Sequence, residues 1–321
     1  MRLGILYIIC LLSLNSCKSN EKQLEPASEV LSFERSDVFN LASGVLYRIS
    51  DFPSEYITPR PVDVWLPEGF SKEKSYAVLY MHDGQMLFDS TATWNKQEWQ
   101  VDEIASRLMN NGSLSDFIIV GIHNISNIRH SDYFPKKPFE SLPKHTQDSL
   151  FVEAKKNNLS LQTLNSDHYL KFLVEELKPV IDSQFPTRTE RQHTFVMGSS
   201  MGGLISMYAI SEYPEIFGGA ACLSTHWIGT FTNTNNPIPN AFFDYMEARL
   251  PDAENHKLYF DYGTETLDAL YLPYQERVSE ILNQKGHSIN TKYDGAAHDE
   301  ISWAKRLHVP LSYLLTNSKK K

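Results

Sequence analysis

Basic side chains are in short supply in this sequence. Its 321 residues include 30 lysines and arginines against 39 aspartates and glutamates, which gives a formal net charge of −9 at pH 7. A protein with this charge repels the phosphate groups of nucleic acids and of anionic lipids. We therefore expect neither as the main partner and favour a neutral or cationic one.

Apolar runs of the roughly 20 residues needed to span a membrane are also missing. The run from Leu3 to Leu14 follows Arg2 and has the length of the hydrophobic region of a signal peptide. It continues into Asn15-Ser16-Cys17, which looks like the lipobox of a bacterial lipoprotein. We predict a signal peptide over residues 1–16, a lipid anchor on Cys17 in the cell envelope and a polar tether over residues 17–38. The alternative is an ordinary secretory signal with a chance cysteine.

Cysteine is scarce, with three residues in the chain. Cys10 would leave with the signal peptide and Cys17 would carry the lipid. Cys222 alone would then remain, so no disulfide within the chain is expected. The sequence has no H-E-x-x-H motif, no C-x-x-C motif and no clustered spacing of metal ligands. We expect neither a metal nor a cofactor.

What the sequence does have is an ordinary globular composition, with 41% hydrophobic and 21% charged residues. Between residues 39 and 318, short β-rich runs alternate with longer helical patterns, which predicts one α/β domain. The first two strands alternate apolar and polar residues as half-buried antiparallel strands do, and the next four are apolar enough for buried parallel strands. Eight strands are expected, at 45–49, 62–66, 77–81, 117–122, 195–197, 220–223, 258–262 and 289–293.

Helical patterns lie between these strands and predict helices on both faces of a mostly parallel sheet. They are centred on residues 97–110, 167–183, 201–213, 270–284 and 301–315. Residues 124–165 are polar and too numerous for a simple connection, so we predict an inserted lid or binding loop there.

The strongest chemical signal is the run Gly198-Ser199-Ser200-Met201-Gly202, which matches G-x-S-x-G where a predicted strand meets a predicted helix. A serine hydroxyl is a poor nucleophile unless a tight turn lifts it out of the sheet beside a base, and flanking glycines permit that turn. Ser200 is the candidate nucleophile. The alternative is a glycine-rich turn in which a serine caps the helix.

A nucleophilic serine needs a base and an orienting carboxylate, which follow it in the order acid, then histidine, in enzymes with this motif. His298 lies on a loop after the last predicted strand and is the candidate base. Two carboxylates follow the seventh strand, and we prefer Asp268 to Glu265 as the acid. The other carboxylate would be a helix cap or a solvated charge.

The oxyanion of an acyl-transfer intermediate needs two N–H donors, one of them from the residue after the nucleophile. That residue is Met201. The loop after the third strand reads His82-Asp83-Gly84-Gln85, where Gly84 allows close approach, so we assign the second donor to Gln85. A plain β-turn in which Asp83 bonds its own backbone is compatible with this assignment.

These motifs together resemble the "Putative esterase" family of α/β-hydrolases, the esterase D-like group with feruloyl, acetyl-xylan and enterochelin esterases. The resemblance rests on the run from Tyr80 to Gln85, the serine turn with its sequel Gly203-Leu204-Ile205-Ser206, the turn from Tyr213 to Gly218 and the loop at His298. It implies a serine hydrolase on an eight-stranded sheet. Family members often place the acid nearer the glycine than Asp268 stands to Gly263, which keeps Glu265 as an alternative.

Several aromatic and polar residues are candidates for substrate binding. His226 and Trp227 follow the sixth predicted strand and should open onto the active-site face, although core packing is an equal alternative for the indole. Trp94 follows the oxyanion loop, and Arg129 begins the predicted lid. Such residues suit a sugar or phenolic ester, or could instead fasten the loop.

The sequence thus predicts a membrane-anchored serine esterase that acts on a small-molecule or glycan ester. An acyltransferase would use the same residues but admit a second hydroxyl in place of water. A glycan-binding lipoprotein without catalytic activity is a third possibility, because one fold can host several functions.

Overall fold

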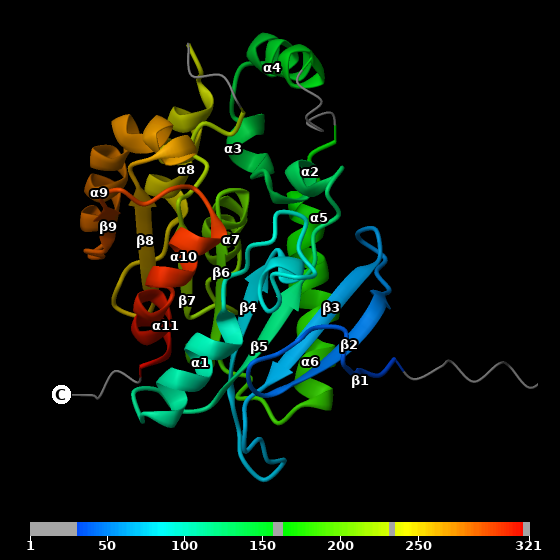
Figure 1. Cartoon of the computed structure of the whole chain (residues 1–321). Coiled ribbons are helices and arrows are strands. Elements are labelled where there is room, and N and C mark those ends of the chain that lie inside the picture. Colours follow the sequence, from blue (N-terminus) through cyan, green and yellow to red (C-terminus); the bar gives the residue numbers. More distant parts are fainter. Residues whose placement is uncertain (1–30, 157–162, 231–234, 317–321) are drawn as a thin grey trace, which may run out of the picture. The chain divides into compact units, whose positions relative to one another are not determined.

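Nine strands form a single sheet in the computed structural model, which describes residues 31–156, 163–230 and 235–316 (Figure 1). The strands lie in the order β1-β2-β3-β5-β4-β6-β7-β8-β9. Neighbouring strands from β1 to β5 along this order are antiparallel, and all pairs from β5 to β9 are parallel. The strands are β1 (Glu34–Ser36), β2 (Val45–Phe52), β3 (Arg60–Leu66), β4 (Ala77–His82), β5 (Phe117–Ile122), β6 (Thr194–Ser199), β7 (Gly219–Leu223), β8 (Lys257–Gly263) and β9 (Asn290–Tyr293).

The prediction of eight strands was one short. All eight expected strands are present, and the ninth, β1, lies within the predicted tether 17–38. Its residues pair with β2, and Phe33 just before it is buried against Phe52 and Phe185, with ring centroids 6.4 and 5.7 Å away. These aromatic contacts fix the segment against the sheet, although its polar composition predicts a tether. The predicted signal peptide and Cys17 lie outside the described residues.

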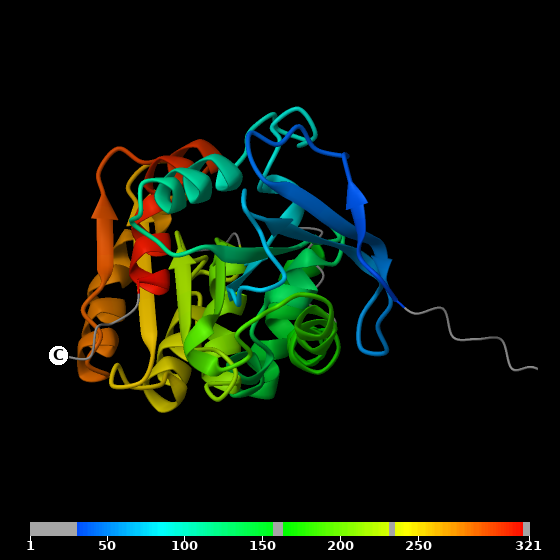
Figure 2. The same ribbon diagram turned by 90° about the horizontal axis from the view of Figure 1, so that it is seen from below.

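Helices cover both faces of the sheet, as predicted (Figure 2). One face is covered by α1, α10 and α11, whose apolar side chains form a core with the inward residues of β4, β5 and β6. The opposite face carries α5 to α9. The longer helices are α1 (Val101–Asn110), α4 (Lys144–Lys156), α7 (Met201–Glu212), α8 (Ile238–Arg249) and α9 (Gln275–Gln284), and the shorter ones are α2 (Arg129–Tyr133), α3 (Lys136–Glu140), α5 (Ser166–Lys171), α6 (Lys178–Gln184), α10 (Glu300–Arg306) and α11 (His308–Leu315).

Three predicted helices are interrupted. The helix expected over 167–183 consists of α5, a π-helical segment η2 (Phe172–Leu177) and α6, and the one expected over 301–315 is divided at Leu307 into α10 and α11. The one expected over 270–284 begins in a 3₁₀ helix, η4 (Thr266–Tyr274), and continues as α9. The predicted lid segment 124–165 holds α2, α3 and α4, of which α3 packs on α8. Its function as a lid stays a prediction.

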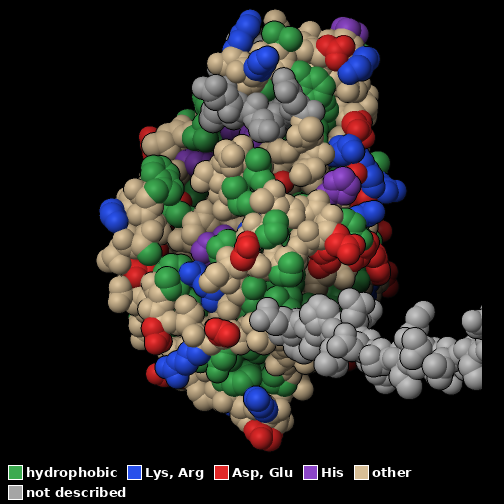
Figure 3. All heavy atoms as spheres, turned by 90° about the vertical axis from the view of Figure 1, so that its right-hand side faces the viewer, with side chains coloured by type: hydrophobic (Ala, Val, Ile, Leu, Met, Phe, Trp, Pro, Cys, Tyr) green, Lys and Arg blue, Asp and Glu red, His purple; other side chains and the backbone are tan. Residues whose placement is uncertain are grey.

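The surface fits the charge balance of the sequence. On the face shown in Figure 3, the basic side chains are scattered among acidic ones. Within the described part of the chain, no helix combines the length and apolar character needed to cross a membrane.

Candidate active site

The motif serine stands on a strained turn between β6 and α7. Ser200 has φ 57° and ψ −122°, a conformation that residues other than glycine rarely adopt. Its backbone N–H donates to the Leu223 carbonyl on the neighbouring strand at 2.9 Å. The tertiary structure therefore holds Ser200 half-buried at the end of the sheet, on the turn that the motif predicts.

Gly198 shows why the turn needs a residue without a side chain. A Cβ at this position would lie 2.7 Å from the carbonyl carbon of Gly202, closer than side-chain carbons approach backbone in proteins. The strand can thus turn directly into α7 only with glycine here.

A pocket of about 550 Å³ opens beside this turn and brings the predicted nucleophile and base together. Ser200 and His298 both line it, as do Gln85, Trp94 and Arg129. The indole of Trp94 is 84% exposed and forms part of the outer wall. The other lining residues are Asp83, Met86, Asn95, Gln97, Trp99, Asn124, Ser126, Ser199, Asp299, Glu300 and Trp303.

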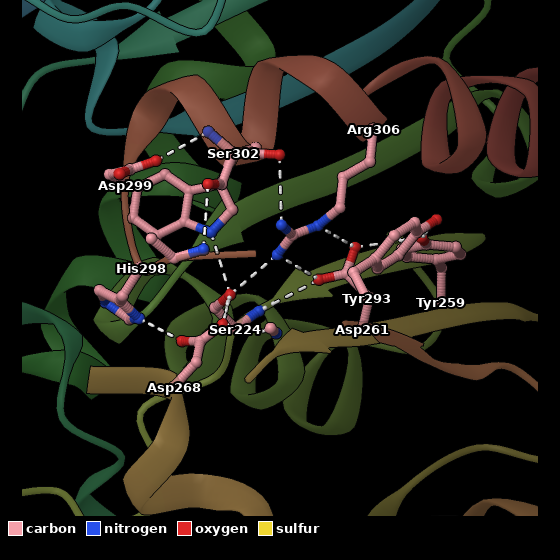
Figure 4. Close-up of polar contacts among 12 residues, drawn as sticks. Ser224, Tyr259, Asp261, Asp268, Tyr293, His298, Asp299, Ser302 and Arg306 are labelled. Carbon is pink, nitrogen blue, oxygen red and sulfur yellow. Dashed lines mark hydrogen bonds and ion pairs between the residues drawn. The ribbon is translucent and has the colours of Figure 1, made fainter. Parts of the chain in front are cut away.

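The imidazole of His298 is held by Asp268. Its Nδ1 lies 2.5 Å from Asp268 Oδ1 (Figure 4). Its backbone N–H donates to Thr266 Oγ1 at 2.8 Å. Asp268 is fully buried in the 3₁₀ helix η4 (Thr266–Tyr274) that follows β8. A carboxylate at Nδ1 favours the tautomer that leaves the Nε2 lone pair free to accept a proton.

Hydrogen bonds keep the Asp268 carboxylate ionised in spite of its burial. Desolvation alone would raise its pKa, but the bonds and charge of His298 and the donors Ser224 Oγ and Gly263 N–H hold the pKa below its usual value. Both of these donors lie 2.6 Å from Asp268 Oδ2. Every oxygen of this carboxylate therefore has a partner, which fixes the direction in which Oδ1 points.

The alternative acid Glu265 is placed differently. Its side chain is exposed, and its backbone N–H donates to the Ala296 carbonyl at 3.0 Å as the chain enters η4. The structure thus places Asp268, the preferred acid, on the imidazole.

The two segments expected to supply oxyanion donors flank the serine. Met201 is the first residue of α7, where backbone N–H groups have no partner within the helix. Gln85 lines the pocket from the loop after β4. That loop packs closely on β5, because a Cβ at Gly84 would lie 2.6 Å from the carbonyl carbon of Gly121.

A partly buried ion pair that sequence reasoning did not identify joins the oxyanion loop to α2. Arg129 donates from Nε and Nη2 to the two carboxylate oxygens of Asp83 at 2.8 and 2.7 Å, and Asn124 Nδ2 donates to Asp83 Oδ1 at 2.7 Å. Burial opposes ionisation of Asp83, but the charge and hydrogen bonds of Arg129 and Asn124 leave its pKa below the usual value. Arg129 therefore lines the pocket as predicted, with its guanidinium bound to Asp83.

Replacing Arg129 with methionine should lower the free energy of unfolding by about 1 to 3 kcal/mol, because Asp83 would keep its hydrogen bond from Asn124 but lose its charged partner. Urea denaturation at pH 7 measures this loss. The double variant Asp83→Asn with Arg129→Met removes the orphaned charge and should recover much of the stability. Equal stability of Arg129→Met and the native chain would show that the pair does not hold the loop.

The prediction that His226 and Trp227 line the pocket was wrong. Trp227 is buried, with its ring stacked on Phe260 at a centroid distance of 6.0 Å. His226 is buried with its Nδ1 2.5 Å from the hydroxyl of Tyr271. The chain turns at Ser224, where φ is 44°, and this turn directs the following side chains into the interior.

Tyr271 is a further residue that the sequence did not single out. Burial raises the pKa of its hydroxyl, and a hydrogen bond with Ser200 acts in the opposite direction. Its ring also meets His298 edge to face, with centroids 5.8 Å apart. No motif marks this tyrosine, and only the folded η4 brings it to the serine.

The residues that the structure describes contain no cluster of metal ligands. No group of three or more histidines, cysteines, aspartates and glutamates in those ranges could hold a metal ion.

Comparison with known proteins agrees with this architecture. The chain is 26% identical over 256 residues to an endo-1,4-beta-xylanase/feruloyl esterase of Xylanibacter ruminicola, covering 76% of this chain and 28% of that protein. The chain thus spans less than a third of the length of that relative.

Solved structures show the same fold at low sequence identity. An enterochelin esterase from Shigella flexneri superposes with a TM-score of 0.61 at 18% identity, covering 86% of this chain and 59% of that one. A ferulic acid esterase from Anaeromyces mucronatus gives a TM-score of 0.54 at 18% identity, with coverage of 93% and 97%. The predicted α/β-hydrolase fold is therefore confirmed.

The sequence profile of the family described as "Putative esterase" matches residues 55–313, which include the serine turn, Asp268 and His298. By this match over most of its length, the chain belongs to the esterase family that its motifs resemble.

Proposed function

We propose that this protein is a serine esterase that hydrolyses carboxylic esters through Ser200, His298 and Asp268. The observation that carries the proposal is the 2.5 Å contact between His298 Nδ1 and Asp268 Oδ1 in the pocket that Ser200 also lines. A serine on a strained turn, an imidazole and a buried carboxylate are the three groups that acyl transfer through serine requires.

In the first half of the reaction, His298 Nε2 takes the proton of Ser200 as Oγ attacks the ester carbonyl. The negative charge that develops on the carbonyl oxygen is stabilised by the backbone N–H groups of Met201 and Gln85. His298 then returns the proton to the leaving alcohol, and an acyl-serine remains. Asp268 stays ionised and stabilises the imidazolium throughout.

In the second half, water replaces the alcohol. His298 removes a proton from water as it attacks the acyl-serine, and then gives that proton back to Ser200 Oγ. The products are the free acid and the regenerated serine, so no cofactor is consumed.

The substrate class we propose is a carbohydrate or phenolic ester of the feruloyl or acetyl-xylan type. The xylanase/feruloyl esterase relative supports this class, as does the ferulic acid esterase among the two structural neighbours. The pocket itself offers the exposed indole of Trp94 beside the polar side chains of Arg129 and Glu300.

A panel of esters tests this proposal with the purified domain. Feruloylated and acetylated xylan oligosaccharides and a siderophore-type ester are supplied in turn, and the released acid is measured by chromatography. We expect release of ferulate or acetate faster than cleavage of the siderophore ester. Absence of hydrolysis across the panel and with a small p-nitrophenyl ester would contradict the proposed activity.

The exposed indole of Trp94 should contribute to binding of an aromatic acyl group. Trp94→Ala is expected to raise KM for a feruloyl ester by about 2- to 10-fold, the size of an aromatic contact, with little change for an acetyl ester. Initial-rate kinetics on the two esters check this difference. An equal change in KM for both would show that Trp94 does not recognise the aromatic group.

The signal peptide, the lipid on Cys17 and a location in the bacterial cell envelope stay predictions from the sequence. On this basis we propose that the protein acts on its ester substrate outside the cytoplasm and is attached to the membrane through its N-terminus.

A further inference from the structure

Ser224 lies behind the acid of the proposed triad, on the side away from the imidazole. It is fully buried and follows β7 with φ 44°, in a left-handed conformation that serine seldom adopts. Its hydroxyl oxygen lies 2.6 Å from Asp268 Oδ2, 3.0 Å from Trp303 Nε1 and 2.9 Å from Arg306 Nη2 (Figure 4). Side chains from two elements, η4 and α10, therefore converge on the one hydroxyl group at the end of β7.

The chemistry of these partners fixes the direction of the hydroxyl hydrogen. The indole N–H and the guanidinium can only donate, so both must use lone pairs of Ser224 Oγ. A hydroxyl has two lone pairs and one hydrogen, and the two donors occupy both lone pairs. The single hydrogen is left for Asp268 Oδ2, which is the remaining neighbour and can only accept while ionised.

Arg306 is itself held firmly in place. From α10 it donates through Nε and Nη2 to the two carboxylate oxygens of Asp261, both at 3.0 Å. Asp261 also accepts from the Ser224 backbone N–H at 3.3 Å and from the Tyr259 hydroxyl at 3.1 Å. The guanidinium that orients Ser224 is thus part of a buried network that spans β8 and α10.

We propose that Ser224, oriented by Arg306 and Trp303, is a positioning residue that holds Asp268 Oδ2 so that Oδ1 meets His298. This inference deepens the proposed function and rests on it. The hydrogen bond also disperses part of the carboxylate charge away from the imidazole. Ser224 would act through Asp268 alone, because its hydroxyl is enclosed by protein and does not line the pocket.

Several titratable groups lie around Ser224 and contribute to the electrostatic potential at its hydroxyl. Asp268 faces it from η4, and His298 lies beyond Asp268 on the loop after β9. On the other side, the groups are Asp261 and Tyr259 of β8, Tyr293 of β9 and Arg306 of α10.

The test compares Ser224→Ala and Ser224→Gly with the native chain. Both variants remove the hydroxyl, and glycine also suits the positive φ, so that loss of folding through backbone strain is avoided. Ser211→Ala is the matched control, because Ser211 is also buried and its Oγ donates to a backbone oxygen, that of Met207, at 2.8 Å. The measurements are kcat and KM across pH, and the rate of labelling by a fluorophosphonate.

Both Ser224 variants should lower kcat by about 10- to 100-fold with little change in KM, the effect of losing a hydrogen bond to a charged group. The acid limb of the pH profile should move to higher pH. With the hydrogen bond gone, more of the Asp268 charge is felt at the imidazole, which favours its protonated and inactive form. Labelling should slow in parallel, and Ser211→Ala should match the native chain.

Two results would overturn the inference in distinguishable ways. If the native chain is active and labelled, and both Ser224 variants keep its kcat and its acid limb, Ser224 does not position Asp268 and the esterase assignment stands. If the native chain neither hydrolyses esters nor reacts with the fluorophosphonate, the esterase assignment itself fails.

Discussion

Replacing Ser200 with alanine is expected to lower the kcat of the protein for a small p-nitrophenyl ester by a factor on the order of 10⁶, as loss of the serine does in well-studied triads. The reason is that the hydroxyl held on the strained turn, which forms the covalent acyl intermediate, would be gone. The turn should survive, since alanine at this position removes only Oγ. Release of p-nitrophenolate measures the rate.

The control for this experiment is Ser211→Ala, on the same helix and away from the pocket. It should keep native activity within a few-fold. A Ser200→Ala protein that retains more than about one part in a hundred of native turnover would contradict the assignment of Ser200, since the residual rate left by the oxyanion donors alone is far smaller.

Asp268→Asn should have the next largest effect, a loss in kcat of about 10⁴-fold. The surroundings of Asp268 decide how the new amide sits. The position of Oδ2 faces the donors Ser224 Oγ and Gly263 N–H, each at 2.6 Å, and therefore selects the amide oxygen. The amide NH₂ then points at His298 Nδ1 and forces the tautomer whose Nε2 carries a hydrogen and cannot act as the base.

Glu265→Gln provides the comparison, because Glu265 lies on the same connection and its side chain is exposed. We expect kcat within about twofold of the native value, since solvent screens an exposed carboxylate that makes no contact with the imidazole. The same assay on the two variants separates the two carboxylates. A large loss with Glu265→Gln and a small one with Asp268→Asn would reverse the assignment of the acid.

Much of the fold follows from the pattern of apolar residues. The eight strands expected from short apolar or alternating runs are all present. The central parallel strands β4 to β7 are recognisable because strands buried on both faces are almost entirely apolar, and β2 and β3 because they alternate apolar and polar residues. Strand β1 escaped prediction since its three residues are polar and gain their place from Phe33, a contact with Phe52 and Phe185 that no local pattern reveals. The division of the last helix at Leu307 has a local cause, because Pro310 lacks the N–H that would donate to the Arg306 carbonyl.

Those parts of the site that depend on a local motif, or on the order of residues along the chain, could be predicted. The glycine spacing around Ser200 and the position of His298 after the last strand are local features with a direct structural meaning. The choice between Glu265 and Asp268 was open because both lie on one loop, and burial in η4 decides it. His226 and Trp227 were misplaced because the turn at Ser224 reverses the side on which the following residues lie.

The polar partners behind the site were beyond sequence reasoning. Ser224, Arg306 and Trp303 lie on β7's end and on α10, about 80 residues apart in the chain, and they meet only after the sheet and α10 have packed. The same holds for Arg129 and Asp83, 46 residues apart. Such pairs are products of the tertiary structure and carry no motif.

The most direct measurement is the location of a covalent adduct by mass spectrometry after treatment of the native protein with a fluorophosphonate. We predict one modification per chain, on the peptide that contains Ser200, and none in the Ser200→Ala protein. An adduct on another residue, or an unmodified chain that nevertheless hydrolyses esters, would contradict the assignment of Ser200 as the nucleophile.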